Sequence, residues 1–339
     1  MKIGITGGCG FVGGHLSRRF RERGDAVVVV DSLIRRGSEI TAASLSRMGV
    51  EVVRGDTRLP GDLHALHGCD VILDCSAQPS AVAGFTKPLA DFEHNTLGVM
   101  NVLELCRREQ CALIFWSTNK VYSGSLVNAI PRVELATRFA WSHAGIGEDF
   151  PLDGADKSIY GATKAAADLL CQEWGVAFDF PVCVNRCSCL AGPMQWGKSE
   201  QGWVAWFCIA AELGLPVELI GWGGKQVRDV LFAPDLCDLI EHQVDARATG
   251  VFAIGGGASC TLSPRELVSW LSAERGFDLP HTLVTEARRS DHAIYVSDIR
   301  RVRHAFSWRP RVSLAAGLTA IVRWARECHG ELAGLYAAG

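Results

Sequence analysis

Tyr160 and Lys164, four residues apart in the segment YGATK, could carry out proton transfer together. On a helix this spacing puts both side chains on one face. A free phenol has a pKa of about 10, and a neighbouring cation lowers it. The phenol could then take a proton from a hydroxyl group while the carbon that bears the hydroxyl gives up a hydride. Because tyrosine and lysine at this spacing are also common in structural helices, the pair needs support from other residues.

Three hydrogen-bonding side chains end an apolar segment elsewhere in the chain. The run ALIF (112–115) leads into WSTNKVY, which places Thr118, Asn119 and Lys120 side by side. Because these side chains lie upstream of YGATK, the spacing of Tyr160 and Lys164 is poorly explained by chance, and a functional role is favoured.

A glycine-rich turn follows the first apolar run of the chain. Gly7, Gly10 and Gly13 are three residues apart and lie between the run at 2–6 and a predicted helix that ends at Gly24. Glycines at this spacing let the turn tighten, the backbone approach a pyrophosphate and the helix pack on the strand. The sequence therefore predicts a dinucleotide-binding turn, with the phosphates at the helix N-terminus.

Asp31, at the end of the second predicted strand, indicates which dinucleotide binds. A carboxylate there can accept both ribose hydroxyls and repel a 2'-phosphate, which favours NAD over NADP. Arg35 and Arg36 leave NADP open, or are solvated loop charges. Asp56, after the third predicted strand, could meet the adenine or cap the strand end.

The elements that must position these residues alternate between apolar strands and helices. Strands without polar alternation predict a parallel sheet covered on both faces. We therefore expect an α/β fold: a Rossmann doubly wound parallel sheet with a smaller C-terminal α/β lobe that binds substrate. We place the NAD-binding domain at 1–180 and the substrate lobe at 181–339, with some later segments returning to the main sheet. The predicted strands are 2–6, 26–31, 50–56, 70–77, 112–117 and 181–192, and the predicted helices include 97–110, 160–176, 203–213 and 264–275.

Composition excludes several classes of protein. The chain has 34 basic and 37 acidic residues and a formal charge of -3. Its overall charge would therefore not attract nucleic acid or an acidic membrane surface. No stretch approaches the roughly 20 apolar residues of a membrane span, and no signal peptide is visible, so we expect a cytoplasmic protein. Thirteen irregularly spaced cysteines and ten histidines show no zinc pattern, and we predict reduced cysteines and no metal.

The sequence resembles the extended short-chain dehydrogenase/reductase family of nucleotide-sugar epimerases and dehydratases over nearly its whole length. The resemblance implies an enzyme that binds NAD and a nucleotide-diphosphate sugar, and a homo-oligomer (dimer or tetramer) formed through the helices near 95–110 and 160–176. The motifs that carry it are TGGCGFVGG, Asp31, GDTR (55–58), Ala77 with Gln78, Asn95 and Gly98, STNKVY, YGATK and GKQVRDVLFAPDL (224–236).

The resemblance also assigns roles position by position. Thr118, Tyr160 and Lys164 would be catalytic, with Tyr160 as the acid/base and Lys164 also on the nicotinamide ribose. The cofactor-binding residues would be Gly7, Gly10, Phe11, Val12, Gly13, Asp31, Asp56, Thr57, Ala77, Gln78, Asn95, Ser117, Tyr160 and Lys164. The substrate-binding residues would be Gln78, Thr118, Asn119, Lys120, Asn185, Gln201, Arg228 and Arg288.

Asn119 and Lys120 favour one reaction within this family. Its 4,6-dehydratases usually carry an acidic pair at these positions, and elimination of water needs an acid and a base that an amide and a cation do not replace. Epimerisation is therefore favoured, and longer segments such as NRCSCLAGPMQWGKSEQGW (185–203) resemble enzymes that invert C2 of a CDP-deoxyhexose. Another nucleotide-sugar epimerase, dehydratase or reductase, or a non-catalytic NAD-binding relative, is an alternative.

Two cations have two interpretations each. Lys120 approaches the sugar or pairs with a neighbour such as Glu134. Arg228 binds the substrate diphosphate or forms a surface ion pair with Asp229 or Asp291, and the same choice applies to Arg288 and Asp291.

Overall fold

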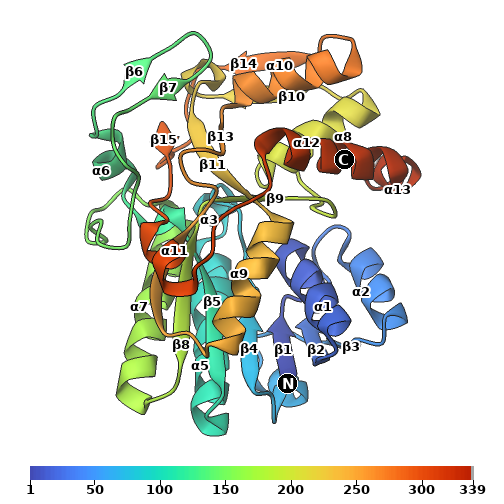
Figure 1. The fold of residues 1–339 in the computed structure, drawn as a ribbon, viewed down its shortest axis with the longest axis vertical. Helices are drawn as coiled ribbons and strands as arrows, with labels where there is room; N and C mark the ends of the chain where they lie inside the picture. Colours follow the sequence, from blue (N-terminus) through green and yellow to red (C-terminus); the bar gives the residue numbers. More distant parts are fainter. Residues whose placement is uncertain (337–339) are drawn as a thin grey trace.

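The main sheet of the computed structural model, which describes residues 1–336, contains seven parallel strands (Figure 1). Their order across the sheet is β3-β2-β1-β4-β5-β8-β12. The order reverses direction between β1 and β4, which is where doubly wound sheets open a crevice for ligands. The strands are β1 (Lys2–Thr6), β2 (Ala26–Asp31), β3 (Glu51–Arg54), β4 (Val71–Asp74), β5 (Ala112–Thr118), β8 (Val182–Cys187) and β12 (Gly250–Ile254).

Helices cover both faces of this sheet. Leu16 and Phe20 from one helix and Leu236 from another pack on one face, whereas Val99 and Ala167 pack on the other. The first group of helices is α1 (Phe11–Arg23), α2 (Ser38–Arg47), α9 (Ala233–Asp245) and α11 (Arg300–Phe306). The second group is α5 (Gly98–Glu109) and α7 (Ser158–Phe178).

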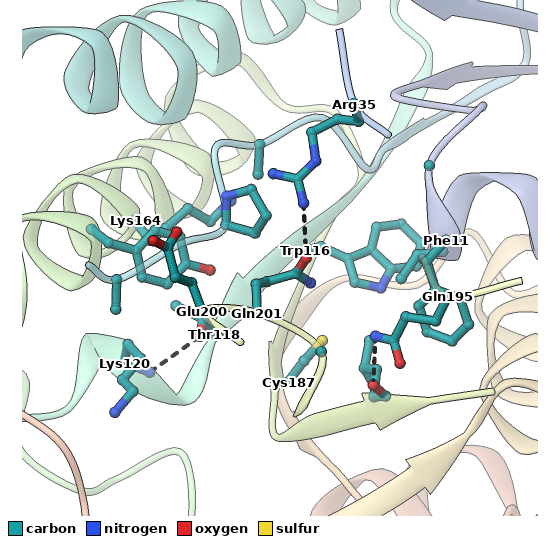
Figure 2. A pocket seen from close by; sticks show the side chains of 18 of the residues that line it. Phe11, Arg35, Trp116, Thr118, Lys120, Lys164, Cys187, Gln195, Glu200 and Gln201 are labelled. Carbon is teal, nitrogen blue, oxygen red and sulfur yellow. Dashed lines mark hydrogen bonds between the residues drawn. The ribbon is translucent and has the colours of Figure 1, made fainter. Parts of the chain in front are cut away.

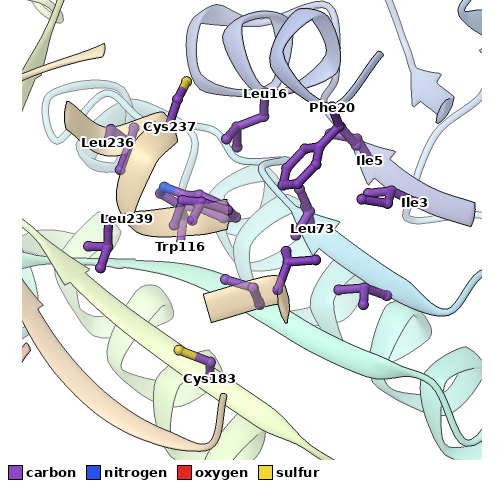
Figure 3. Packing of buried hydrophobic residues seen from close by; sticks show 14 of the residues in the cluster. Ile3, Ile5, Leu16, Phe20, Leu73, Trp116, Cys183, Leu236, Cys237 and Leu239 are labelled. Atoms are coloured by element: carbon purple, nitrogen blue, oxygen red, sulfur yellow. The ribbon is translucent and has the colours of Figure 1, made fainter. Parts of the chain in front are cut away.

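The central strands are mostly apolar because their side chains alternate between these two buried faces. Ile114 and Trp116 of β5 join the core on the side of α1 and α9, and Leu113 and Phe115 join the core on the side of α5 and α7. Figure 3 shows the first core, where Phe20 lies between its own helix and the strands. The predicted Rossmann fold is confirmed.

A smaller lobe, in the upper half of Figure 1, packs over the carboxyl ends of the strands. Its own core joins helix α8 to helices near the C-terminus. Its strands are β9 (Cys189–Ala191), β10 (Val217–Ile220), β11 (Val227–Phe232), β13 (Thr261–Leu262), β14 (His281–Val284) and β15 (Ile294–Tyr295). Its helices are α8 (Trp203–Leu213), α10 (Pro264–Arg275), α12 (Leu314–Glu327) and α13 (His329–Tyr336).

Short elements complete the description. The helical ones are α3 (Ala83–Thr86), α4 (Pro88–Phe92), α6 (Gly124–Asn128), the 3-10 turns Pro60–Leu66, Asn119–Val121 and Trp222–Gly224, and the π-turn Glu93–Leu97. The hairpin strands are β6 (Val133–Glu134) and β7 (Phe139–Ala140).

The single strand predicted at 181–192 is wrong, because this segment forms two strands in different sheets. β8 pairs with β5 and β12, whereas β9 pairs with β11 of the smaller lobe. Ser188 lies between them: its backbone N–H donates to the carbonyl of Ile254, and its hydroxyl donates to the backbone carbonyl of Asp229 at 3.0 Å. The chain thus passes from the sheet to the lobe beside the crevice. The division of the chain near residue 180 stays a prediction.

Candidate active site

A single cavity of about 610 Å³ lies between the carboxyl ends of the strands and the smaller lobe (Figure 2). Its wall includes Gly7 and Asp31 from the first two strand ends, Thr118 and Tyr160 near its middle, and Arg228 from the lobe. The structure therefore brings the glycine turn, the STNKVY segment and the YGATK segment to one place.

The glycine turn is shaped for close contact. Gly7 has a φ of 60°, and a Cβ there would lie 2.8 Å from the carbonyl oxygen of Cys75. Gly10, Phe11 and Val12 line the cavity at the start of α1. Gly13 lies behind the turn, where a Cβ would come within 2.4 Å of the Gly7 carbonyl oxygen. These residues leave backbone N–H groups and a helix N-terminus toward the cavity, an arrangement that fits a pyrophosphate.

Asp31 is buried at the end of β2, and its carboxylate lines the cavity. It accepts hydrogen bonds from the backbone N–H groups of Cys9 and Leu33 at 2.9 and 2.8 Å. Burial raises the pKa of the Asp31 carboxyl, and these two bonds act in the opposite direction. The bonds fix the carboxylate, whose remaining lone pairs can accept from ribose hydroxyls.

Further along the cavity wall, Asp56, Thr57 and Ala77 follow β3 and β4. Asp56 forms an ion pair with Arg58 at 2.6 Å, and Arg58 lowers the pKa of its carboxyl. Ser117, at the end of β5, also lines the cavity and donates to Asp168 of α7 at 2.5 Å.

Tyr160 lies beside Thr118 because α7 packs tightly on the turn that follows β5. A Cβ on Gly161 would lie 2.2 Å from the carbonyl oxygen of Lys120, so only glycine allows this approach. Burial raises the pKa of Tyr160 to about 12, and its hydrogen bond with Thr118 acts in the opposite direction. The protein alone thus raises the pKa of Tyr160; the expectation that a neighbouring cation together with an oxidised nicotinamide lowers it stays a prediction.

Lys164 is almost completely buried one helical turn after Tyr160, and it lines the cavity. Its ammonium lies 4.0 Å from the centre of the Phe115 ring. Burial lowers the pKa of Lys164, and the nearby Asp74 opposes this effect. The buried ammonium can donate hydrogen bonds, so it suits a ligand whose hydroxyl oxygens can accept them.

Asp291 holds two of the predicted substrate-binding cations. Its Oδ1 atom accepts from Lys120 Nζ at 2.5 Å and from Arg228 Nη2 at 2.7 Å. Although burial opposes its ionisation, Lys120 and Arg228 hold the pKa of Asp291 well below its usual range. Lys120 does not pair with Glu134, whose partner is Lys225. Asn119 lines the same part of the cavity.

Three of the predicted contact residues lie away from the cavity or already have protein partners. Asn185 is fully buried in β8, and its amide forms two hydrogen bonds with Gln243, away from the cavity. The amide of Gln78 is bonded to Asp91 and to the backbone of Ser80, and the side chain of Asn95 clamps the backbone of Gln78. Asn95 and Gln78 thus hold the loop that presents Ala77. The sequence could not show this role, because a local pattern does not reveal which partners compete for an amide.

Two other predicted residues, Gln201 and Arg288, line the cavity from the smaller lobe side. Gln201 accepts from Arg35 at 2.8 Å (Figure 2), and Arg288 donates to the carbonyl of Ser199 at 2.7 Å. Sequence reasoning did not assign Asp291 to the site. The sequence named it only as an alternative ion-pair partner of Arg228 and Arg288: the pair with Arg228 is present at 2.7 Å in the cavity wall, whereas Arg288 bonds Ser199.

The fold and the site define an NAD-dependent epimerase/dehydratase. The chain belongs to this family, whose model, described as the NAD dependent epimerase/dehydratase family, matches residues 3–255.

Among curated relatives, a CDP-paratose 2-epimerase of Salmonella typhi is 33% identical over 96% of this chain and 99% of its own length. A dTDP-glucose 4,6-dehydratase of Streptomyces griseus is 30% identical over 94% of this chain and 92% of its own length.

Solved structures agree with the fold. A UDP-glucose 4-epimerase of Thermus thermophilus in complex with NAD has a TM-score of 0.81 at 26% identity, covering 96% of this chain and 99% of that one. A dTDP-glucose 4,6-dehydratase of Streptomyces venezuelae, also with NAD bound, has a TM-score of 0.83 at 26% identity, covering 99% and 100%. The glycine turn and Asp31 fit this cofactor, and the chain is an NAD-dependent enzyme.

Within residues 1–336, no helix has the length and apolar character needed to span a membrane. In the same part of the chain, no three His, Cys, Asp or Glu side chains come together as a metal site requires, and no cysteine forms a disulfide.

Proposed function

We propose that this enzyme inverts C2 of a CDP-deoxyhexose, in a reaction of the CDP-paratose to CDP-tyvelose type. The observation that carries the proposal is the chemistry of positions 119 and 120. Dehydratases that the sequence resembles carry an acidic pair there, whereas this chain has an amide and a lysine whose ammonium is 2.5 Å from Asp291. The identity of 33% to a CDP-paratose 2-epimerase supports the choice of sugar and nucleotide.

Different residues of the cavity would carry out proton transfer, cofactor binding and diphosphate binding. Tyr160 takes the proton from the sugar hydroxyl at C2, Thr118 holds the same oxygen, and Lys164 holds the nicotinamide ribose. Arg228 and Arg288 bind the diphosphate, which a guanidinium suits because it donates several N–H bonds in one plane. NAD supplies a centre that accepts a hydride and gives it back.

Inversion requires the oxidised sugar to present its other face before the hydride returns. Tyr160 then donates the proton back to the same oxygen, so the reaction consumes no cofactor. The diphosphate contacts keep the nucleotide in place during this turn of the sugar. Asn119 and Lys120 line the cavity, and neither carries a carboxyl group that could act at these two positions as the acid for a departing hydroxyl.

Incubation with CDP-paratose in deuterated water separates this reaction from its alternatives. C2 inversion without solvent deuterium is expected. Deuterium at C5 or C6, or a stable keto-sugar, would instead support a dehydratase, the activity of the 30% identical relative from Streptomyces griseus. Inversion at C4 would support a 4-epimerase, and stoichiometric release of reduced NAD would support a dehydrogenase. Turnover that consumes added reduced NAD would support a reductase, and no turnover of any nucleotide sugar would support a non-catalytic relative. In every active case, Tyr160→Phe should abolish turnover and leave NAD bound.

A homo-oligomer formed through α5 and α7 belongs to the same proposal. These helices pack on each other and leave apolar side chains exposed beside them, with Leu169 54% and Val176 81% exposed. Exposed apolar surface of this kind typically marks a protein interface. The predictions of a cytoplasmic location, of no nucleic-acid or membrane partner and of no metal stay predictions.

A further inference from the structure

Three consecutive residues just before α8 each bond to a different loop around the cavity. The carbonyl of Ser199 accepts from Arg288, which belongs to the smaller lobe. Glu200 accepts from Ser80, in the loop after β4, at 3.4 Å. Gln201 accepts from Arg35, in the loop after β2, at 2.8 Å. The segment therefore crosses the cavity where its cofactor side meets its substrate side.

The rest of this loop is anchored on the Rossmann domain beside Asp31. The carbonyl of Pro193 accepts from His15 of α1 at 2.8 Å, and the ring of Trp196 lies against Gly37, where a Cβ would come within 2.4 Å. The chain terminus reinforces this contact, because Tyr336 donates to the carbonyl of Gly197 at 2.5 Å.

A second cation strengthens the same junction. The guanidinium of Arg36 lies 4.4 Å from the centre of the Tyr336 ring. Arg35 and Arg36, which the sequence left open as NADP determinants or solvated charges, thus both contact the smaller lobe. Arg35 contacts Gln201 and Arg36 contacts Tyr336, so both arginines join the loop after β2 to the smaller lobe.

We propose that residues 193–203 form a strap that retains NAD, and that the Arg35–Gln201 hydrogen bond is its latch. The strap spans from α1 to the loop after β2, the two elements whose ends carry the glycine turn and Asp31. These residues line one cavity, so the strap would cover a dinucleotide held by those two elements, and the latch would have to open before the dinucleotide leaves. The biological role rests on the proposed function, because an enzyme that returns its hydride needs the same cofactor molecule throughout one cycle.

The substrate side of the strap is held differently. Arg288 bonds only a neutral carbonyl there, at an exposed position. A diphosphate is a much stronger acceptor for a guanidinium than a peptide carbonyl. Arg288 can therefore move from Ser199 to an arriving substrate while Gln201 stays bonded to Arg35, and substrate exchanges without release of the cofactor.

Exchange of bound NAD for isotopically labelled NAD tests the latch directly, in the absence of any sugar. Gln201→Leu removes the acceptor, and Arg35→Met removes the donor. Each variant should exchange NAD about tenfold faster than the natural protein, as expected for loss of a hydrogen bond to a charged group. The double variant should exchange no faster than either single variant, because both changes remove one bond. Arg47→Met, at the exposed end of α2, is the matched control and should exchange at the natural rate.

A conservative variant guards against simple misfolding. Gln201→Glu keeps an acceptor and adds a charge opposite Arg35, so its exchange should be as slow as in the natural protein or slower. The proposal is overturned if Gln201→Leu exchanges at the natural rate, if Gln201→Glu exchanges faster, or if only Arg35→Met has an effect, since Arg35 would then hold NAD itself. None of these outcomes bears on which sugar carbon is inverted.

Discussion

Tyr160 is the residue whose protonation decides whether the proposed chemistry can start. Burial raises its pKa to about 12, and the pKa values of the other three tyrosines, Tyr122, Tyr295 and Tyr336, are also raised by burial. Because a raised pKa favours the protonated phenol, all four tyrosines should be neutral at physiological pH in the protein without NAD. An added positive charge near Tyr160, such as that of an oxidised nicotinamide, would lower this pKa.

Ultraviolet titration of phenolate absorbance measures this effect. Without NAD, no phenolate should form below about pH 10, the ordinary value for tyrosine. With oxidised NAD bound, one phenolate should form at a clearly lower pH, and Tyr160→Phe should lack it. An identical titration with and without NAD would show that the cofactor does not activate Tyr160.

The chemistry of single residues was predictable where spacing is local. Tyr160, Lys164 and Thr118 occupy short motifs, and the structure brings all three to the cavity. Asp291 was named only as an alternative partner of Arg228, and its pairing with Lys120 was missed because the two residues come from distant elements. Asn185 looked available in sequence, yet Gln243 occupies its amide, since a buried polar group takes the nearest partner that satisfies it.

At the scale of elements, a buried ion pair fixes the strand end that carries Thr118 against the helix that carries Tyr160. Asp168 of α7 receives two bonds from Arg186 of β8, at 2.9 and 3.0 Å, and one from Ser117 of β5. Asp168 is completely buried and Arg186 nearly so. The pair therefore joins α7, β8 and β5 just behind the site.

Loss of one partner should be costly, because it leaves a buried charge without compensation. Arg186→Met should lower the free energy of unfolding by about 3 kcal/mol, as measured by urea denaturation. The double variant Arg186→Met with Asp168→Leu should recover part of this loss. Equal stability of Arg186→Met and the natural protein would show that the pair does not hold these elements together.

Strand positions were predictable to within a few residues because each strand is a short apolar run. β2 was predicted with its observed bounds, Ala26–Asp31. The run at 181–192 failed for a different reason: two strands follow each other with only Ser188 between them, and apolar pattern does not show which sheet a strand joins.

For the whole molecule, the exposed apolar residues of α7 and its neighbours predict self-association. The natural protein should sediment as a dimer or larger at micromolar concentration, and Val176→Glu should shift it toward the monomer by placing a charge in the interface. Leu283→Glu, at a position of β14 that is 55% exposed, is the control and should leave the mass unchanged. A monomeric natural protein would contradict the proposed interface.

The overall architecture followed from the regular alternation of the first half of the chain, whereas the junction of the two lobes did not. The contacts of Arg35, Arg36 and Gly37 with Gln201, Tyr336 and Trp196 join residues far apart in sequence. Such contacts depend on how the finished lobes meet, and no local pattern records that.

The central claim is that the hydride removed from C2 of the sugar returns to C2 on the opposite face. CDP-paratose that carries deuterium at C2, incubated with the enzyme in ordinary water, tests it most directly. We expect CDP-tyvelose with the deuterium retained at C2, seen by NMR and mass spectrometry, and no such product with Tyr160→Phe. Inverted product that has lost its deuterium to water would contradict hydride return, and unchanged C2 with a keto-sugar elsewhere would contradict the proposed reaction.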